Sequence, residues 1–244
     1  MYRLQSAMSS GRMALLVELP SNSAELAECA EQAGADSLLM QVYNEHPVTG
    51  AYTGGPDLEA AQMKALLSVL KVPVGLHVGN QKFLTREDWE QIASLGFDYV
   101  AMNAVRIPPF VMYDPRIPKL PYVTAGMPFD YYRVLSSYEG VFSLCYEVAS
   151  QVQAEGTARF NVMDIVTLSL VSKLSLKPVL FRVSQDVMGE DVKGLMEAGC
   201  SGLLLDPAFG GSSAEQFRLY TATFREAIDG LKKRTVFRFP SSWG

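Results

Sequence analysis

The sequence predicts an α/β protein that folds as a single (β/α)8 barrel, and three observations support this. A phrase made of an amphipathic helix end, a glycine and a dense apolar run occurs three times, at 30–39, 92–102 and 195–205. Eight strand candidates can be counted, and most are followed by a helical pattern. The chain has 244 residues, close to the roughly 250 that such a barrel takes. We therefore expect one TIM-barrel domain spanning 1–244.

The glycine of each repeated phrase marks the end of a helix. Gly34, Gly96 and Gly199 stand where a helix C-cap needs left-handed backbone, which glycine adopts without a Cβ penalty. The apolar runs that follow lack clean alternation, so both faces of these strands are predicted to be buried, as in a parallel sheet.

The strand candidates recur along the whole chain, and eight of them favour a closed barrel over an open doubly wound sheet. In chain order they are Met13–Leu19, Ser37–Tyr43, Val74–Val78, Tyr99–Ala104, Leu120–Ala125, Val141–Glu147, Val179–Val183 and Gly202–Asp206. Plausible helix N-caps are Ser21, Ser23, Asp57, Thr85, Asp130 and Ser213.

Two segments depart from the regular pattern. The stretch 107–128 is rich in proline, so we expect a short turn of helix and an extended loop there. The loop Tyr43–Asp57 is long for a βα loop and rich in glycine, tyrosine and threonine. It is either a lid or substrate loop or a surface loop without fixed structure.

Composition narrows the classes of partner. The net charge of −5 gives no reason to expect binding to nucleic acid or to an anionic membrane surface. No apolar run approaches the roughly 18 residues of a membrane span, and the N-terminus lacks the apolar core of a signal peptide. Three scattered cysteines are typical of a reducing compartment, so we expect a cytoplasmic protein.

Polar residues at the predicted strand ends are the candidates for the site, because active sites of this fold lie at the C-terminal mouth of the barrel. The catalytic candidates are Glu18, His77, Asn103 and Arg182, and the substrate-binding candidates there are Gln41 and Glu147. Since side chains alternate along a strand, only some of them can point inward.

His77 and Arg182 each allow two interpretations. An imidazole titrates near neutral pH, so His77 is either a general acid/base or phosphate donor, or a hydrogen-bonded histidine of the interior. An arginine in an apolar strand needs an anionic ligand or an acidic partner. For Arg182 such a partner could be Glu147 or Asp206 in a structural network.

The loop after the eighth strand is a candidate anion site. Gly210, Gly211, Ser212 and Ser213 precede the last helix, whose free N–H groups favour phosphate. The alternative is an ordinary capped helix with a glycine-rich lead-in. The acidic Asp186 in the preceding loop argues against phosphate, because it would repel an anion.

The stretch Lys71–Pro109 resembles the synthase subunit of pyridoxal 5′-phosphate synthase. The matching residues are Pro73, Val74, Val78, Leu95, Gly96, Asp98, Tyr99, Val105 and Pro108. The resemblance implies a phosphate-binding (β/α)8 barrel. The family's Schiff-base lysine falls on His77, and its strand-four acids fall on Ala101, Met102 and Ala104. No lysine lies within a predicted strand, so we expect neither that activity nor lysine-aldolase chemistry.

The favoured function is that of a lyase or isomerase acting on a small phosphorylated or carboxylated metabolite. Glu18 and His77 would form the acid/base pair, Asn103 and Gln41 would orient the substrate, and Arg182 would hold an anionic group. No cofactor or resident metal follows from the sequence.

Other functions stay open at this point. One is a non-catalytic barrel that binds a metabolite or serves as an assembly subunit, which the missing lysine favours. Another is a lyase assisted by a divalent metal, with Glu18, Glu147 and Asp206 as oxygen ligands. A flavin oxidoreductase has no motif in its support. The apolar tail Arg234–Gly244 packs back under the barrel or meets another subunit, and we lean to a homo-oligomer formed through it.

Overall fold

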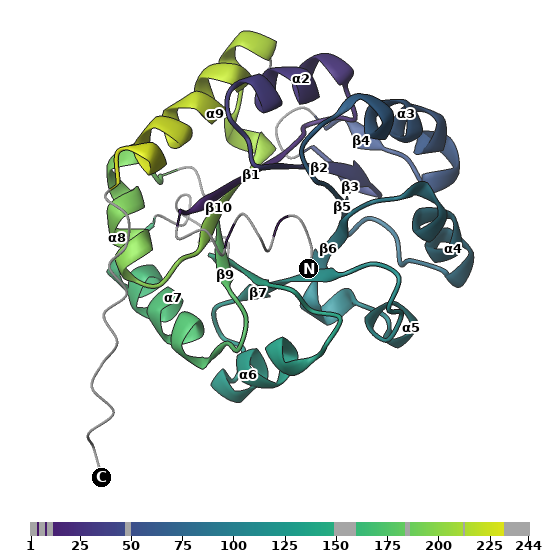
Figure 1. The fold of residues 1–244 in the computed structure, drawn as a ribbon. Coiled ribbons are helices and arrows are strands. Elements are labelled where there is room, and N and C mark those ends of the chain that lie inside the picture. The colour runs from purple at the N-terminus through teal and green to yellow at the C-terminus, as the bar shows by residue number, and fades with distance from the viewer. Residues whose placement is uncertain are drawn as a thin grey trace.

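The eight predicted strands close into a parallel barrel (Figure 1). The computed structural model describes residues 4, 8, 12–46, 50–148, 160–183, 186–211 and 213–231. The barrel strands are β1 (Ala14–Glu18), β2 (Ser37–Val42), β5 (Val74–Val78), β6 (Tyr99–Asn103), β7 (Lys119–Thr124), β8 (Leu144–Glu147), β9 (Val179–Val183) and β10 (Gly202–Leu205). They pair in this order around the barrel, and β10 closes against β1. The (β/α)8 fold is confirmed.

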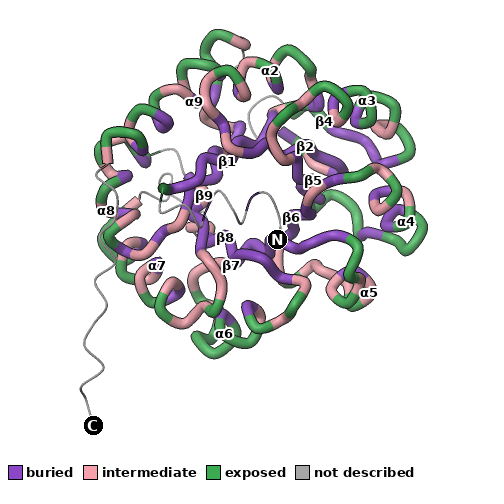
Figure 2. Tube along the Cα trace, in the orientation of Figure 1, coloured by how far each residue is buried: buried purple, intermediate pink, exposed green. Residues whose placement is uncertain are grey.

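Helices form an outer layer around the strands (Figures 1 and 2). Within the described residues they are α2 (Ala24–Gln32), α3 (Pro56–Val69), α4 (Arg86–Leu95), α5 (Pro109–Met112), α6 (Phe129–Ser137), α7 (Val162–Leu174), α8 (Val192–Glu197) and α9 (Ala214–Asp229). The three predicted C-terminal glycines are left-handed, with φ of 95° at Gly34, 95° at Gly96 and 104° at Gly199. The repeated phrase therefore marks helix ends for the reason expected.

Half of the predicted N-caps begin helices. Ser23, Thr85 and Ser213 are N-caps, and the last two form capping boxes. Asp57 and Asp130 lie instead in the first turns of α3 and α6, where a carboxylate interacts favourably with the helix dipole. Ser21 lies two residues before Ser23, the N-cap of α2.

The proline-rich stretch holds the four-residue helix α5 followed by extended chain, as expected. The expectation that no lysine lies within a strand is wrong in this stretch. Strand β7 begins at Lys119, one residue before the predicted strand. The Lys119 side chain is buried, and its ammonium donates to the backbone carbonyl of Asp114. Burial lowers the pKa of Lys119. This amine lies at the N-terminal end of the barrel, 6.0 Å from the ring of Trp89 on α4, and so cannot serve the mouth.

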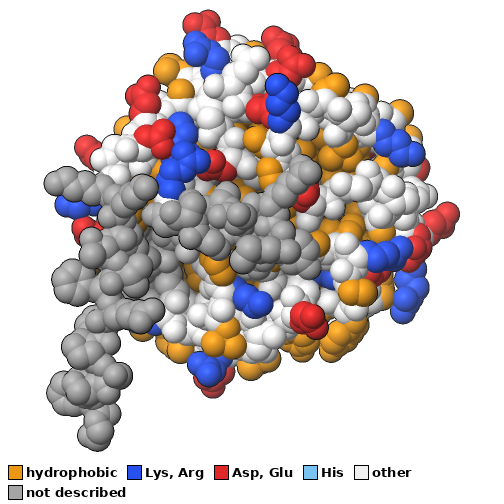
Figure 3. Space-filling model, in the orientation of Figure 1, with side chains coloured by type: hydrophobic (Ala, Val, Ile, Leu, Met, Phe, Trp, Pro, Cys, Tyr) orange, Lys and Arg blue, Asp and Glu red, His pale blue; other side chains and the backbone are white. Residues whose placement is uncertain are grey.

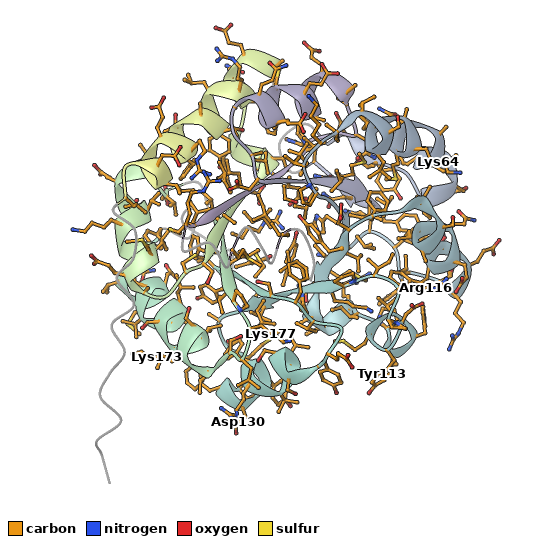
Figure 4. The ribbon with its side chains drawn as sticks, in the orientation of Figure 1. Lys64, Tyr113, Arg116, Asp130, Lys173 and Lys177 are labelled. Carbon is orange, nitrogen blue, oxygen red and sulfur yellow. The ribbon has the colours of Figure 1, made fainter. Side chains whose placement is uncertain are left out.

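Other lysines lie farther out. Lys64 is on α3 and Lys173 is on α7, and both are seen in the outer helix layer (Figure 4). No lysine among the described residues forms part of the cluster at the mouth that is set out below.

The barrel has an apolar interior. Inward-facing residues of the strands form one buried cluster, which comprises Ala14, Leu16, Leu39, Tyr99, Ala101, Leu120, Tyr122, Phe142, Cys145, Leu180 and Leu204. Leu4 and Met8 belong to the same cluster. A second cluster packs the outward faces of the strands against the helices.

The long loop after β2 is ordered in its described part. It contains the short antiparallel strands β3 (Asn44–Glu45) and β4 (Tyr52–Thr53), whereas 47–49 lie outside the described residues. The C-terminal tail also lies outside them, so the homo-oligomer stays a prediction.

Two further observations concern the charged side chains of the surface and the length of the helices. Figure 3 shows basic and acidic side chains interspersed on the visible face. In the part of the chain that is described, none of the helices has the length and apolar character needed to cross a bilayer.

Candidate active site

The side chains at the C-terminal ends of the strands form two layers of four, each supplied by alternate strands. The first layer consists of Glu18 (β1), His77 (β5), Tyr122 (β7) and Arg182 (β9). The second consists of Gln41 (β2), Asn103 (β6), Glu147 (β8) and Asp206, which follows β10. Most of these residues come two positions after a residue of the interior cluster, so strand alternation directs them inward.

The four side chains of the first layer contact one another in a closed ring. His77 Nδ1 lies 2.5 Å from Glu18 Oε1, and Arg182 Nη2 lies 3.0 Å from Glu18 Oε2. The Tyr122 ring completes the circle, with its centroid 5.1 Å from that of His77 and 5.1 Å from Arg182 Cζ. Three of the four predicted catalytic residues thus come together, with Tyr122 as an unpredicted fourth member.

Glu18 is the ionised centre of this ring. Its carboxylate is fully buried, and Gln41 Nε2 donates to Oε1 at 3.0 Å. Burial alone would raise the pKa of Glu18, but Arg182 and then His77 outweigh burial, and the pKa lies below its ordinary value. An ionised carboxylate only accepts hydrogen bonds, so His77 Nδ1 is the donor in their contact. The other ring nitrogen of His77, Nε2, is then the one that can take a proton.

Arg182 is enclosed by carboxylates. Its Nε lies 2.9 Å from Asp206 Oδ2, and its Nη1 lies 3.9 Å from Glu147 Oε2, in addition to the ion pair with Glu18. Burial would lower the pKa of Arg182, but Asp206 and then Glu18 raise it well above the ordinary value. Both acidic partners that the sequence suggested for a structural network are present.

Exposure to solvent differs among the charged side chains of the mouth. The exposed fraction of the side chain is 0% for Glu18, 8% for His77 and 15% for Arg182. It rises to 19% for Asp206 and 32% for Glu147. Of the three carboxylates, Glu18 is therefore shielded from solvent, whereas Asp206 and Glu147 are partly accessible to it.

Tyr122 is the member of the ring that the sequence interpretation missed. Its hydroxyl is buried and has no hydrogen-bond partner among the described residues. Burial, and then the nearby Glu18, raises the pKa of Tyr122 well above its ordinary value, so the phenol stays neutral. Alternation from the inward Leu120 would have identified Tyr122 as inward-facing.

The second layer contains the remaining predicted residues. Gln41 Nε2 also donates to the backbone carbonyl of Leu19 at 2.6 Å, and Asn44 Nδ2 donates to Gln41 Oε1 at 2.6 Å, which joins the β3–β4 hairpin to the Glu18 carboxylate. His46 of the same loop is also buried. Asn103 instead accepts a hydrogen bond from Val105 N–H at 3.1 Å, and the structure gives it no contact with the ring.

The glycine-rich loop has a structural role at the start of α9. A Cβ on Gly210 would lie 2.5 Å from an aromatic carbon of α9, and Gly211 has a left-handed φ of 79°. Ser213 Oγ accepts from Gln216 N–H at 3.2 Å as the N-cap. Ser212 lies outside the described residues. Anion binding by this loop stays a prediction.

The described residues contain no group of three or more His, Cys, Asp or Glu side chains arranged to hold a metal ion. Glu18 and Asp206 each face Arg182, with Glu147 farther from it, so the guanidinium lies among the carboxylates that the metal alternative required.

Comparison with known proteins identifies the fold and no family. No family model matches the sequence, and no curated protein matches it either. Among solved structures, the chain is similar to tryptophan synthase from M. tuberculosis in its ligand-free form, with a TM-score of 0.66, 13% identity and coverage of 93% of this chain and 99% of that chain.

Two further solved structures agree. The tryptophan synthase alpha-subunit from Pyrococcus furiosus has a TM-score of 0.64 at 13% identity, covering 90% of this chain and 98% of that one. Phosphoribosyl anthranilate isomerase from Thermus thermophilus has a TM-score of 0.62 at 13% identity, covering 88% and 99%. At this identity the likeness shows a shared (β/α)8 fold.

Proposed function

We propose that this protein is an enzyme that transfers a proton at a carbon next to a carbonyl group in a small metabolite, as lyases and isomerases do. The observation that carries the proposal is the Glu18–His77 pair in the floor of the mouth, with 2.5 Å between Oε1 and Nδ1. A buried, ionised carboxylate fixes the tautomer of the imidazole and stabilises its protonated form. His77 Nε2 then acts as the general base.

In this mechanism Arg182 does not hold the anionic group of the substrate. Its guanidinium is already surrounded by Glu18, Asp206 and Glu147, so it is a poor receptor for a second anion. It holds Glu18 ionised and supplies positive charge near the oxygen on which negative charge develops. A phosphate or carboxylate of the substrate would bind instead at the start of α9, around Gly211 and Ser213.

The structural neighbours include, by their names, a synthase and an isomerase, in agreement with the reaction class expected from the sequence. The sequence resemblance to a phosphate-binding barrel supports a phosphorylated substrate. A second candidate is a non-catalytic barrel, and the observation that favours it is the mutual pairing of Glu18 and Arg182, which could simply fill the barrel end.

Exchange of carbon-bound hydrogen for deuterium separates the two candidates. The purified protein is incubated in D2O with ketose phosphates, the free ketoses and small hydroxy-acid phosphates, and proton NMR follows the loss of the signal next to the carbonyl. The wild type is expected to catalyse exchange on at least one compound. His77→Gln should slow it by about 10²- to 10⁴-fold while remaining folded.

Glu139→Gln, which removes an exposed carboxylate of the loop after α6, serves as the matched control and should exchange like the wild type. Absence of exchange in the wild type, together with a lower melting temperature for His77→Gln, would favour the non-catalytic barrel.

A further inference from the structure

We infer that Glu147 is the second acid–base group of this site, and that the reaction is a 1,2-proton shift between an α-hydroxy aldehyde and an α-hydroxy ketone. The inference rests on the proposed function, because it adds a partner to His77. An isomerisation, unlike proton abstraction alone, also needs a group that transfers a proton between the two substrate oxygens. We assign this role to Glu147.

Two of the three carboxylates at the mouth are already engaged by other groups of the protein. Glu18 is fully buried and is contacted by His77, Gln41 and Arg182. Asp206 uses one oxygen for Arg182 Nε at 2.9 Å and the other to accept from Ala208 N–H at 2.9 Å. Burial therefore shields Glu18 from a bound molecule, and each oxygen of Asp206 already accepts a hydrogen bond.

Glu147 is in a different state. Its contact with the described residues of the mouth is Oε2 to Arg182 Nη1 at 3.9 Å, longer than a hydrogen bond. Its side chain is also the most exposed of the three carboxylates. Of these carboxylates, Glu147 is therefore the one that can accept a proton from a bound molecule.

The positions of His77 and Glu147 around the barrel also suit two separate roles. His77 lies on β5, the third strand around the barrel counted from β1, and Glu147 lies on β8, the sixth. The two side chains thus come from nearly opposite walls of the mouth, with Tyr122 of β7 beside His77 and Arg182 of β9 beside Glu147. A small substrate bound between them presents its carbon–hydrogen bond to one wall and its oxygens to the other.

The reaction balances with these two groups and needs no further reactant. His77 Nε2 takes the proton from the hydroxyl-bearing carbon, and the electron pair of that bond forms the double bond of an enediolate as the carbonyl electrons move to oxygen. The Glu147 carboxylate takes the proton of the hydroxyl group on the carbon that lost its hydrogen. It delivers this proton to the former carbonyl oxygen. His77 then returns its proton to the former carbonyl carbon, and the second oxygen becomes the new carbonyl.

The charge of the mouth fits hydroxyl groups at the reacting end. Glu18, Glu147 and Asp206 outnumber the single guanidinium of Arg182, so the site is richer in acceptors than in cations. Carboxylates accept protons from hydroxyls and repel anions. The anionic group of the substrate accordingly lies away from the carbons that react.

The experiment measures two readouts on Glu147→Gln. The probes are dihydroxyacetone phosphate, erythrulose phosphate and ribulose 5-phosphate, incubated in D2O and followed by proton NMR. Carbon–deuterium exchange reports the His77 step, and the appearance of the aldose reports the complete shift. Glu147→Gln is expected to keep exchange within about tenfold of the wild type, while aldose formation falls by about 10²- to 10⁴-fold.

Asp206→Asn is the comparison variant, because it removes a neighbouring carboxylate whose oxygens are engaged with Arg182 and Ala208. It should reduce both readouts together and lower the melting temperature. Glu139→Gln should change neither readout. A separation of the two readouts is thus specific to a group that moves protons between the substrate oxygens.

Three results would overturn the inference. Aldose formation by Glu147→Gln at the wild-type rate would remove Glu147 from the reaction and leave the proposed function standing. Equal loss of both readouts with a lower melting temperature would make Glu147 structural. Absence of exchange by the wild type on every probe would remove the role of Glu147 together with the isomerase assignment.

Discussion

At the scale of single residues, the mouth contains charged side chains with several polar contacts each and one tyrosine hydroxyl without a hydrogen-bond partner among the described residues. Glu18, Arg182 and Asp206 are held by several contacts each. The Tyr122 hydroxyl is buried without a partner among the described residues. Tyr99, the first residue of β6, shares a hydrogen bond of 2.9 Å with the Ser37 hydroxyl. The two tyrosines therefore form a matched pair for measuring what an unmet hydrogen bond does to stability.

We predict that Tyr122→Phe leaves the free energy of unfolding unchanged or slightly raises it, because no hydrogen bond is lost and a desolvated hydroxyl is removed. Tyr99→Phe should lower the free energy of unfolding by about 1 kcal/mol, because the hydrogen bond between the Tyr99 and Ser37 hydroxyls is lost. Urea unfolding followed by circular dichroism measures both. A clear loss of stability for Tyr122→Phe would mean that its hydroxyl is bonded in solution, for example to a buried water.

At the scale of elements, the start of α9 combines a structural cap with the predicted anion site. Ser213 Oγ accepts from Gln216 N–H, and the Gln216 side chain accepts from Ser213 N–H at 3.3 Å. The left-handed Gly211 leads the chain into this cap. Replacing the glycine would disturb the path into the helix, so a substitution at Ser213 is the cleaner test of phosphate binding.

We predict that inorganic phosphate binds the wild type at this helix start and that Ser213→Asp abolishes binding while keeping the cap. Aspartate caps a helix as well as serine does, but its charge repels phosphate. Ser213→Ala should lower the free energy of unfolding by about 1 kcal/mol. Isothermal titration with phosphate and urea unfolding give the two values. Equal phosphate binding by the wild type and Ser213→Asp would move the anion site elsewhere.

At the scale of the whole molecule, the ring ties together strands from the beginning, middle and end of the chain. Glu18 on β1 contacts His77 on β5 and Arg182 on β9, and β1 also closes the barrel against β10. The charge on Glu18 is thus linked to global stability. Its pKa in the folded protein lies below the ordinary value of 4.5, so the folded state favours the ionised form.

We predict that the stability contributed by Glu18 is fully present above pH 4.5 and is lost as the pH falls through its lower folded pKa. At neutral pH, Glu18→Gln should be less stable by about 3–5 kcal/mol, because Arg182 loses a buried partner. The difference between the two proteins should shrink in acid. Urea unfolding across a pH series measures it, and a difference that stays constant with pH would show that Glu18 is not ionised in the fold.

The sequence by itself determined the architecture, because the signals for it are local. The signals are properties of short segments: a left-handed glycine after a helix, and then a strand that is apolar on both faces. Gly34, Gly96 and Gly199 all have the left-handed backbone that the end of a helix needs. The same local logic located most polar strand ends, and with them Glu18, His77, Gln41, Glu147 and Arg182. It failed at Lys119, because a buried lysine in a strand depends on the carbonyl that receives it.

Only the tertiary structure decided which of these side chains meet. Strand register brings Glu18, His77, Tyr122 and Arg182 into one layer, although they are far apart in the chain, and it puts Asn103 and Glu147 into the next. A tyrosine in an apolar strand looks like core in sequence, so Tyr122 became visible only beside Arg182 and His77. The position of Arg182 among Glu18, Glu147 and Asp206 likewise depends on carboxylates from three other strand ends. Distances between strands are set by closure of the barrel and not by any one segment.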